Sequence, residues 1–417
     1  MVTAKKPSIL KAFTSWRMFV VLIMGFSAGI PFALTGATLQ AWMADRNVDL
    51  TVIGIFSLVS MPYALKFLWS PLMDRYVPPF MGRRRGWMLI TQVGIILGII
   101  ALGFSDPVSS SGQVALIAVL VAFFSSSQDI VIDAYRTEML PQEEFGVGAG
   151  IYVMGYRIAM IVSGGGALIL ADQMPWSYVY LIMAAAMCIG LIASLFGPEP
   201  VLDAKPPKSL TEAVVLPFME FFKRKGALET LLFLLLYKLD VFLTLAMQTP
   251  FLLELGFTKT DIGAVTKFFG MFAVIVGTLF GGGLMIKLGL RRALWIFGIA
   301  QALSGLSYMA LAHIGASYPL MVTAIAVENL CSGMGIAAYS AFMMSLCDKR
   351  FTATQYALLS SFMGLSRGIV QTPSGFLAKA FGWEYYFLVC TLIGIPGLLL
   401  LTRFKKWYLP NTNEAKS

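Results

Sequence analysis

Nine ionisable side chains interrupt long apolar stretches of this sequence, and these residues are the ones most able to do chemistry. Each stretch is close to the roughly 20 apolar residues that a helix needs to cross a bilayer. A charge at the centre of such a helix costs about 2.5–3.5 kcal/mol on insertion scales, so it normally faces a partner or a wet pathway. The pattern therefore indicates a polar route through a membrane protein. The nine residues are Lys66, Asp129, Asp133, Arg157, Lys238, Asp240, Lys267, Glu328 and Arg367.

Asp129 and Asp133 are the strongest candidates for proton coupling. They stand four residues apart, so on a helix they share one face. Two carboxylates this close in an apolar medium resist joint ionisation, which lets one of them carry a proton. Asp129 lies deeper in its apolar stretch and is the better candidate, whereas Asp133 is alternatively a gating contact. The competing interpretation is that each is a permanent salt-bridge partner, for instance of Arg157.

The second half of the chain carries its own set of charges. Lys238 and Asp240 are two residues apart and point about 200° from one another on a helix, so they cannot pair closely. Their partners must come from elsewhere, and Lys267, Glu328 and Arg367 are available. The nine charges comprise five cations and four anions, and a surplus cation suits a substrate that carries carboxylates. Alternatively, some of these charges only hold helices together. The candidates for substrate binding are Gln40, Lys66, Gln128, Arg157, Lys238, Lys267, Glu328 and Arg367.

The elements that position these residues are expected to be transmembrane helices. Hydrophobic residues make up 58% of the 417 residues and charged residues 13%, against about 25% charged in soluble domains. About twelve spans are predicted in an all-α polytopic protein, with a proline-rich linker at 198–227 between units at 1–197 and 228–417. The spans are placed at 18–43, 51–73, 87–105, 113–136, 147–170, 175–197, 228–253, 261–285, 293–313, 318–347, 353–378 and 382–403.

The two six-helix units resemble one another. Residues 154–157 (MGYR), 163–164 (SG) and 176–178 (WSY) are matched by 363–367 (MGLSR), 374–375 (SG) and 383–385 (WEY). Two six-helix repeats are the build of the major facilitator fold, whose substrates bind at the midplane between the halves. That fold is therefore predicted.

Lysine and arginine positions predict the orientation, because loops rich in these residues stay in the cytoplasm. With both termini cytoplasmic, 23 of the 31 Lys and Arg residues fall in cytoplasmic segments, three in outside loops and five within spans. The basic residues thus form rims at the membrane, where they meet lipids. This distribution excludes a nucleic-acid-binding surface, despite the net charge of +9.

The loop after the second span combines an acid with a basic cluster. An aspartate at a helix end and arginines across a short turn can latch helices together when the cytoplasmic side is closed. A plain positive-inside anchor explains the arginines equally well, but topology needs no acid there. The predicted gating residues are Asp74, Arg75, Arg83, Arg84 and Arg85.

Enzyme signatures are absent from the sequence. It has one histidine, and it contains neither an HExxH motif nor a GxxxxGK[ST] phosphate loop. No catalytic residue, metal or cofactor is expected, and an ion gradient is the natural source of energy for transport.

Several polar motifs resemble the AmpG muropeptide permease family. They are 38–43 (TLQAWM), 67–76 (FLWSPLMDRY), 82–87 (GRRRGW), 127–134 (SQDIVIDA), 155–157 (GYR), 328–335 (ENLCSGMG) and 353–360 (ATQYALLS). One departure is that family members carry Lys-Leu-Gly-Asp in the seventh span, whereas this chain reads Lys238-Leu239-Asp240. The acid is thereby displaced by one residue, or about 100° around a helix.

The resemblance implies a proton-coupled importer of anhydromuropeptides, which are disaccharides of N-acetylglucosamine and anhydro-N-acetylmuramic acid with or without a stem peptide. Uptake would run from periplasm to cytoplasm across the inner membrane of a Gram-negative bacterium, during cell-wall recycling, by a monomer. The alternatives are a related carrier of another anionic metabolite, similar to acetyl-coenzyme A transporters, and a drug exporter of the same fold.

Overall fold

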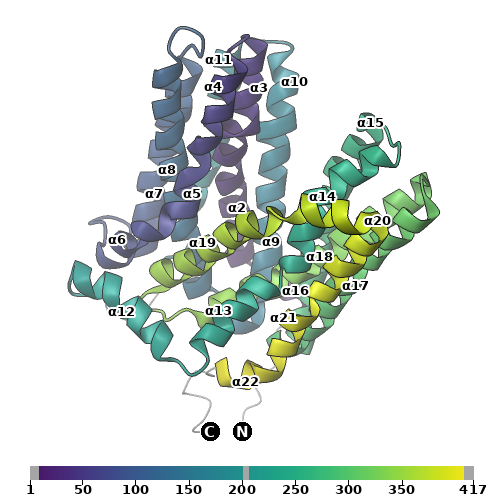
Figure 1. The fold of residues 1–417 in the computed structure, drawn as a ribbon. Coiled ribbons are helices and arrows are strands. Elements are labelled where there is room, and N and C mark those ends of the chain that lie inside the picture. The colour runs from purple at the N-terminus through teal and green to yellow at the C-terminus, as the bar shows by residue number, and fades with distance from the viewer. Residues whose placement is uncertain (1–8, 201–205, 408–417) are drawn as a thin grey trace.

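The protein is a bundle of helices, seen in Figure 1 as a computed structural model that describes residues 9–200 and 206–407. Residues 1–8, 201–205 and 408–417, which include the outer edges of the predicted units and part of the predicted linker, lie outside this description. The described residues contain no strand. They contain 11 helical stretches long and apolar enough to cross a membrane.

The first half contains six spans, several of them built from short consecutive helices. Here η marks 3-10 or π-helical pieces. The elements are α1 (Ile9–Phe13), α2 (Trp16–Thr35), α3 (Ala37–Asp45), α4 (Leu50–Ile55), η1 (Phe56–Ser60), α5 (Met61–Leu65), η2 (Lys66–Leu68), α6 (Ser70–Arg75), α7 (Arg83–Gly103), α8 (Ser111–Met139), η3 (Gln142–Glu144), α9 (Phe145–Met160), η4 (Ile161–Gly166), α10 (Ala167–Ala171) and α11 (Trp176–Phe196).

The second half follows an additional helix, α12, which lies within the predicted linker and was not among the predicted spans. The elements are α12 (Leu210–Lys223), α13 (Ala227–Leu236), α14 (Leu239–Glu254), α15 (Lys259–Ile262), η5 (Gly263–Phe269), α16 (Gly270–Leu288), α17 (Leu290–Ile314), α18 (Tyr318–Leu346), α19 (Thr352–Gln371), α20 (Ser374–Ile393), α21 (Ile395–Leu400), η6 (Leu401–Arg403) and α22 (Phe404–Trp407).

The eleventh and twelfth spans meet at a glycine turn inside α20. Gly382 has a φ of 72°, a left-handed value that glycine adopts without steric cost. Residues 374–381 therefore continue the span that α19 begins, and residues 383–403 form the last span. By length and apolar composition the described residues hold 11 candidate spans, against the about twelve predicted, and α19 is not among the 11.

The two halves meet at one end of the molecule and diverge at the other. Figure 1 shows α12 and α22 near the end where the halves meet, which we call the closed end. Toward the opposite end, α3, α4 and α10 of the first half lie apart from α15 and α20 of the second. We call this the open end.

Glycines explain how closely the halves approach at the closed end. A Cβ atom added to Gly150 of α9 would lie 2.6 Å from the backbone oxygen of Thr278 of α16, and one added to Gly282 would lie 2.4 Å from the Gly146 oxygen. Such contacts let two helix backbones touch, as small residues do in membrane bundles. In contrast, a Cβ at Gly164 or Gly364, farther toward the open end, meets no atom within 4 Å.

The helices that pass between the two ends are not regular. In α9, the helix that meets α16, the backbone continues into the π-helix η4, and α16 is preceded by the π-helix η5. Short π-helical segments inside α-helices are frequent at functional sites. Both facing spans thus change geometry where the halves begin to part.

The linker helix α12 is fastened to the second half at the closed end. The Gln355 side chain of α19 donates hydrogen bonds to the Pro217 oxygen at 3.2 Å and to the Glu220 carboxylate at 2.7 Å. Arg224, just after α12, donates to the backbone oxygen of Leu346 at the end of α18, at 2.5 Å. The predicted linker at 198–227 therefore holds an ordered helix that is fastened to the second half.

Replacing Gly150 by valine should hold the closed end apart, because its side chain would overlap the α16 backbone. We expect the spin-label distance between positions 143 and 349, one on each side of the closed end, to shift toward longer values. Gly164→Val is the matched control, since its site is open. Unchanged distances in the Gly150 variant would contradict this view of the contact.

Candidate functional site

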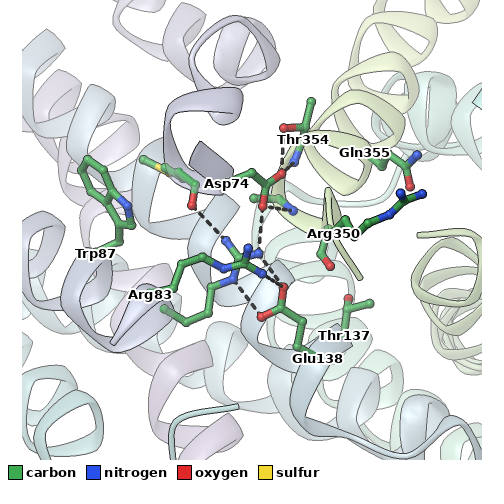
Figure 2. A network of polar contacts seen from close by, with 12 residues as sticks. Asp74, Arg83, Trp87, Thr137, Glu138, Arg350, Thr354 and Gln355 are labelled. Carbon is green, nitrogen blue, oxygen red and sulfur yellow. Dashed lines mark hydrogen bonds and ion pairs between the residues drawn. The ribbon is translucent and has the colours of Figure 1, made fainter. Parts of the chain in front are cut away.

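Asp74 forms a bridge between the two halves at the closed end. Its side chain is fully buried at the end of α6 and reaches the first turn of α19, as Figure 2 shows. One carboxylate oxygen accepts hydrogen bonds from the Thr354 backbone N–H and from the Thr354 hydroxyl, both at 2.8 Å, and the other accepts from the Ala353 N–H at 3.3 Å. The first N–H groups of a helix lack partners within it and carry partial positive charge. Asp74 therefore caps a helix of the opposite half.

Arg84 and Glu138 complete this network, which we call the latch (Asp74, Arg84, Glu138, Thr354). The Arg84 guanidinium is 1% exposed and lies between two carboxylates: Nη2 donates to Asp74 at 2.9 Å, and Nε donates to Glu138 at 2.9 Å. Arg83 adds a contact to Glu138 at 3.0 Å. Buried charges persist only when they are paired in this way. The predicted contact between an acid and the basic cluster across the turn is thus present for Asp74 and Arg84.

The other two predicted gating residues lie outside the latch. Arg85 donates hydrogen bonds to the backbone oxygens of Ser194 and Leu195, where α11 ends, so it neutralises a helix C-terminus within its own half. Arg75 stacks over the Tyr76 ring at 5.5 Å. Neither side chain joins the latch in this structure, and a gating role for Arg75 and Arg85 stays a prediction.

Asp133 belongs to a buried ion-pair cluster near the latch. It pairs with Arg136 one turn along α8 and with Lys66, whose Nζ is 3.8 Å from its carboxylate. The Arg136 guanidinium lies 3.9 Å from the centroid of the Tyr152 ring. It also contacts Tyr356 of α19, in the other half. Asp133 is therefore engaged by two cations, and the suggested pairing with Arg157 is wrong.

Asp129 differs from Asp133 although the two share a helix face. Its Oδ1 atom is buried and has no hydrogen-bond partner among the described residues. Lys66 and Arg136 are the cations whose charge acts on it, and Asp133 is the neighbouring like charge. Of the two predicted coupling residues, Asp129 is the one with an unsatisfied carboxylate oxygen.

The second half holds a polar cluster around the break between α13 and α14. Lys238 Nζ donates to the Gln301 side-chain oxygen at 2.7 Å, and the Gln301 amide donates to the two Asp240 oxygens at 2.9 and 3.1 Å. Lys238 and Asp240 do not pair directly, as the helix geometry predicted. Their shared partner, however, is Gln301 of α17 and not Lys267, Glu328 or Arg367. Asp240, the acid that is displaced by one residue in the Lys-Leu-Asp sequence, thus has a defined hydrogen-bond partner in Gln301.

Two arginines from opposite halves face a common region. Arg157 of α9 and Arg367 of α19 interact electrostatically across the boundary between the halves. Among the described residues no salt bridge joins either of them to a carboxylate. Arg367 is exposed and lies 5.8 Å from the centroid of the Phe242 ring. Lys267, on η5, is likewise exposed.

The predicted glutamines occupy different environments. Gln40 is partly exposed and belongs to α3, a helix near the open end in Figure 1. Gln128 is fully buried, and its side chain donates to the Ser27 hydroxyl on α2 at 2.8 Å. Its side-chain oxygen is buried without a hydrogen-bond partner among the described residues, so a role of Gln128 in substrate binding stays a prediction.

Comparison with known proteins identifies the family. The sequence matches the family model of the Major Facilitator Superfamily over residues 21–371 and again over 239–416. It is 47% identical to the anhydromuropeptide permease of Escherichia coli K12, over 94% of this chain and 80% of that protein. The chain belongs to the AmpG permease family of this superfamily. It is also 33% identical to putative transporter AmpG 4 of Rickettsia felis, over 95% of this chain and 99% of that protein.

Solved structures agree on the fold of this AmpG-family chain. The proton:xylose symporter XylE superposes with a TM-score of 0.68 at 12% identity, over 95% of both chains. The human organic anion transporter MFSD10 superposes with a TM-score of 0.63 at 15% identity, over 95% of this chain and all of that one. The predicted major facilitator fold is confirmed.

Several residues of these clusters were missed by sequence reasoning. Gln301 could have been found, since it is a hydrogen-bonding side chain in an apolar span, the same criterion that selected Gln40 and Gln128. Arg136 stands three residues after Asp133, a helical pairing distance. Thr354 and Glu138 gave no such signal, because their partners come from distant parts of the chain.

Replacing Asp74 by alanine should weaken the closed end of this AmpG-family permease. Loss of a helix cap costs about 0.5–2 kcal/mol, and a buried arginine would also lose one of its partners. We expect the spin-label distance between positions 143 and 349 to lengthen in a larger fraction of molecules. Arg75→Ala is the matched control, because Arg75 lies beside the latch without joining it. An equal effect of both variants would refute a specific role for Asp74.

Proposed function

We propose that this protein imports anhydromuropeptides together with protons, from the periplasm to the cytoplasm, for recycling of the cell wall. The observation that carries the proposal is the polar route between the halves of an AmpG-family permease. Within the part of the chain that the structure describes, it holds a carboxylate with an unsatisfied oxygen, Asp129, and two arginines without a salt bridge to a carboxylate, Arg157 and Arg367. The relative with 47% identity is an anhydromuropeptide permease, which supplies the substrate class.

The arginines suit the carboxylates of such a substrate. A guanidinium binds a carboxylate through two parallel hydrogen bonds, and this pair is stronger than a contact between neutral groups. Because Arg157 and Arg367 come from opposite halves, a carboxylate between them would relieve their mutual repulsion and draw the halves together. The remaining candidates on elements near the open end are Gln40, which is partly exposed, and Lys267, which is exposed, and they suit the polar groups of the sugars.

Asp129 suits the role of proton carrier. An ionised carboxylate in an apolar environment is stable only with partners for its oxygens. Asp133 has two cationic partners, whereas one Asp129 oxygen has none. Protonation from the periplasmic side would neutralise Asp129, and loss of the proton on the cytoplasmic side would let it compete with Asp133 for Lys66.

The orientation assigns the two ends. The basic rims lie at the closed end, next to α12 and the latch, so the positive-inside rule makes this end cytoplasmic. The open end then faces the periplasm, and the structure represents the outward-facing state that loads substrate. Import would proceed by closure around the substrate and opening of the latch, the alternating access expected of this fold.

Uptake into vesicles tests proton coupling directly. We expect accumulation of labelled anhydromuropeptide to require an inward proton gradient and to collapse with a protonophore. Asp129→Asn should lose gradient-driven accumulation while binding of substrate persists, because a neutral amide cannot release a proton. Asp106→Asn, in an exposed loop, is the control variant. Accumulation by the Asp129 variant at the wild-type level would eliminate the coupling role.

The two arginines are tested by changing the substrate and the protein together. Losing a charge-assisted hydrogen bond costs about 1.5–3 kcal/mol, so Arg157→Gln and Arg367→Gln should each raise the KM for the free-acid substrate roughly tenfold or more. An analogue with its carboxylates amidated should bind wild type and variants alike. Lys379→Gln, with its exposed cation, should leave the KM unchanged. If the ratio of the KM values for the free-acid substrate and the amidated analogue is the same in the variants as in wild type, the arginines do not bind the substrate carboxylates.

A further inference from the structure

We propose that Glu328 is a second proton site, located in the C-terminal half, and that its proton decides whether Lys238 stays bound to Gln301. The inference rests on the proposed proton-coupled transport and extends it to a residue that was expected only to bind substrate. It assigns to the second half a carboxylate that works alongside Asp129 of the first.

The first argument is the condition of the Glu328 carboxylate. The residue lies in the middle of α18 and is 2% exposed, and both of its carboxylate oxygens are buried without a hydrogen-bond partner among the described residues. An ionised carboxylate in this condition is strongly disfavoured, whereas a protonated one is tolerated because it carries no net charge. The outward-facing state therefore holds a proton on Glu328.

The second argument is the arrangement of the neighbouring charges. Lys238 and Asp240 act on Glu328 from the α13–α14 region, Tyr308 faces it from α17, and Cys331 is its titratable neighbour on α18. Lys238 is the only cation among these groups. Its ammonium is held by Gln301 at 2.7 Å and forms no ion pair within 4.0 Å among the described residues. The cation that would neutralise an ionised Glu328 is thus nearby and occupied elsewhere.

The third argument is a small polar cavity between the acids. It has a volume of about 10 Å³ and is lined by both Asp240 and Glu328 together with Gln301. The hydroxyl-bearing residues Thr244 and Ser304 also line it. A volume of this size is about that needed for one water molecule. A water there would connect Glu328 with Asp240 and provide the first step for a departing proton.

The backbone provides a place for the response. Span seven is interrupted at Lys238, which has φ −114° and ψ 3° between the end of α13 at Leu236 and the start of α14 at Leu239. Across from it on α18, Gly335 leaves room for this contact, since a Cβ there would lie 2.3 Å from the Gln301 oxygen and 3.0 Å from Lys238 Nζ. Lys238 lies at the break between α13 and α14, and α14 packs against α19 and α20. A change in the partner of Lys238 would therefore alter the backbone at this break.

The proposed step is a simple proton transfer. The O–H bond of Glu328 breaks, and its proton passes to water in the cavity and onward to the cytoplasmic side. The negative charge left on Glu328 attracts Lys238, which leaves the Gln301 oxygen and pairs with the new carboxylate. Gln301 then remains bound to Asp240 alone, and the break in span seven changes its contacts.

Glu328→Gln tests this assignment, because glutamine resembles a permanently protonated glutamate. The variant should exchange labelled for unlabelled anhydromuropeptide across vesicle membranes, yet fail to accumulate it when a proton gradient is imposed. Glu254→Gln, an exposed carboxylate at the end of α14, is the matched control and should accumulate substrate normally. Glu328→Asp, which keeps a titratable group, should restore accumulation in part, with a changed pH profile.

Infrared spectroscopy of the purified protein gives a readout independent of transport. Wild type should show the carbonyl stretch of a buried protonated carboxylic acid that is missing in Glu328→Gln and retained in Glu254→Gln. An unchanged band in the Glu328 variant would overturn the assignment even if that variant were poorly active.

The outcomes separate this inference from the function on which it rests. Wild-type uptake that ignores a protonophore would remove proton coupling itself and this role with it. Protonophore-sensitive wild-type uptake combined with normal accumulation by Glu328→Gln would overturn the Glu328 assignment alone.

Discussion

The contact between the Asp74 carboxylate and the first turn of α19 is the interaction on which the closed end depends. The Asp74 carboxylate that joins the halves is fully buried. A buried charge stabilises a structure only while all of its partners are in place. Arg84 supplies the opposite charge from the same half, whereas the helix N–H groups of residues 353 and 354 come from the other half. When the halves separate, Arg84 remains with Asp74 while the helix end must find water. The latch can thus open without leaving an unpaired charge behind.

The second contact between the halves is built on a different principle. Around Gly150 and Gly282, α9 and α16 touch through their backbones, and no ion pair joins these two helices among the described residues. Such packing is strong only at close range, because a gap of about 1 Å between the two surfaces already removes a large part of the dispersion attraction. The closed end therefore combines an apolar contact sensitive to distance with a polar contact sensitive to the position of α19. Although the sequence repeats are related, the two inter-half contacts are not equivalent.

The fold followed from sequence because its main constraint is local. A helix that crosses a bilayer needs an apolar segment of about 20 residues, and a charge within that segment is energetically unfavourable. The spans and the nine unusual charges can therefore be recognised from the order of the residues. The partners of these charged side chains could not be recognised in this way, since they depend on how each helix is rotated and on which helix lies opposite. Helical spacing separated Lys238 from Asp240, but only the packing of α17 brings Gln301 between them. Likewise Gln128 looked like a site residue by composition, and its burial against Ser27 became apparent only from the arrangement of α2 and α8.

The two halves share a feature that follows from this packing and bears on how the transporter turns over. Each contains a lysine at an irregular point of a span, Lys66 in η2 and Lys238 before α14. Each lysine acts on a carboxylate that lacks hydrogen-bond partners among the described residues, at one oxygen of Asp129 and at both oxygens of Glu328. In each case the lysine is already engaged, by Asp133 in one half and by Gln301 in the other. A proton on the unsatisfied carboxylate makes this arrangement stable. After the proton is lost, the lysine would bind the newly ionised carboxylate more strongly than its present partner. Deprotonation would therefore act on backbone that is not held by regular helical hydrogen bonds, which is where a span can bend at least cost.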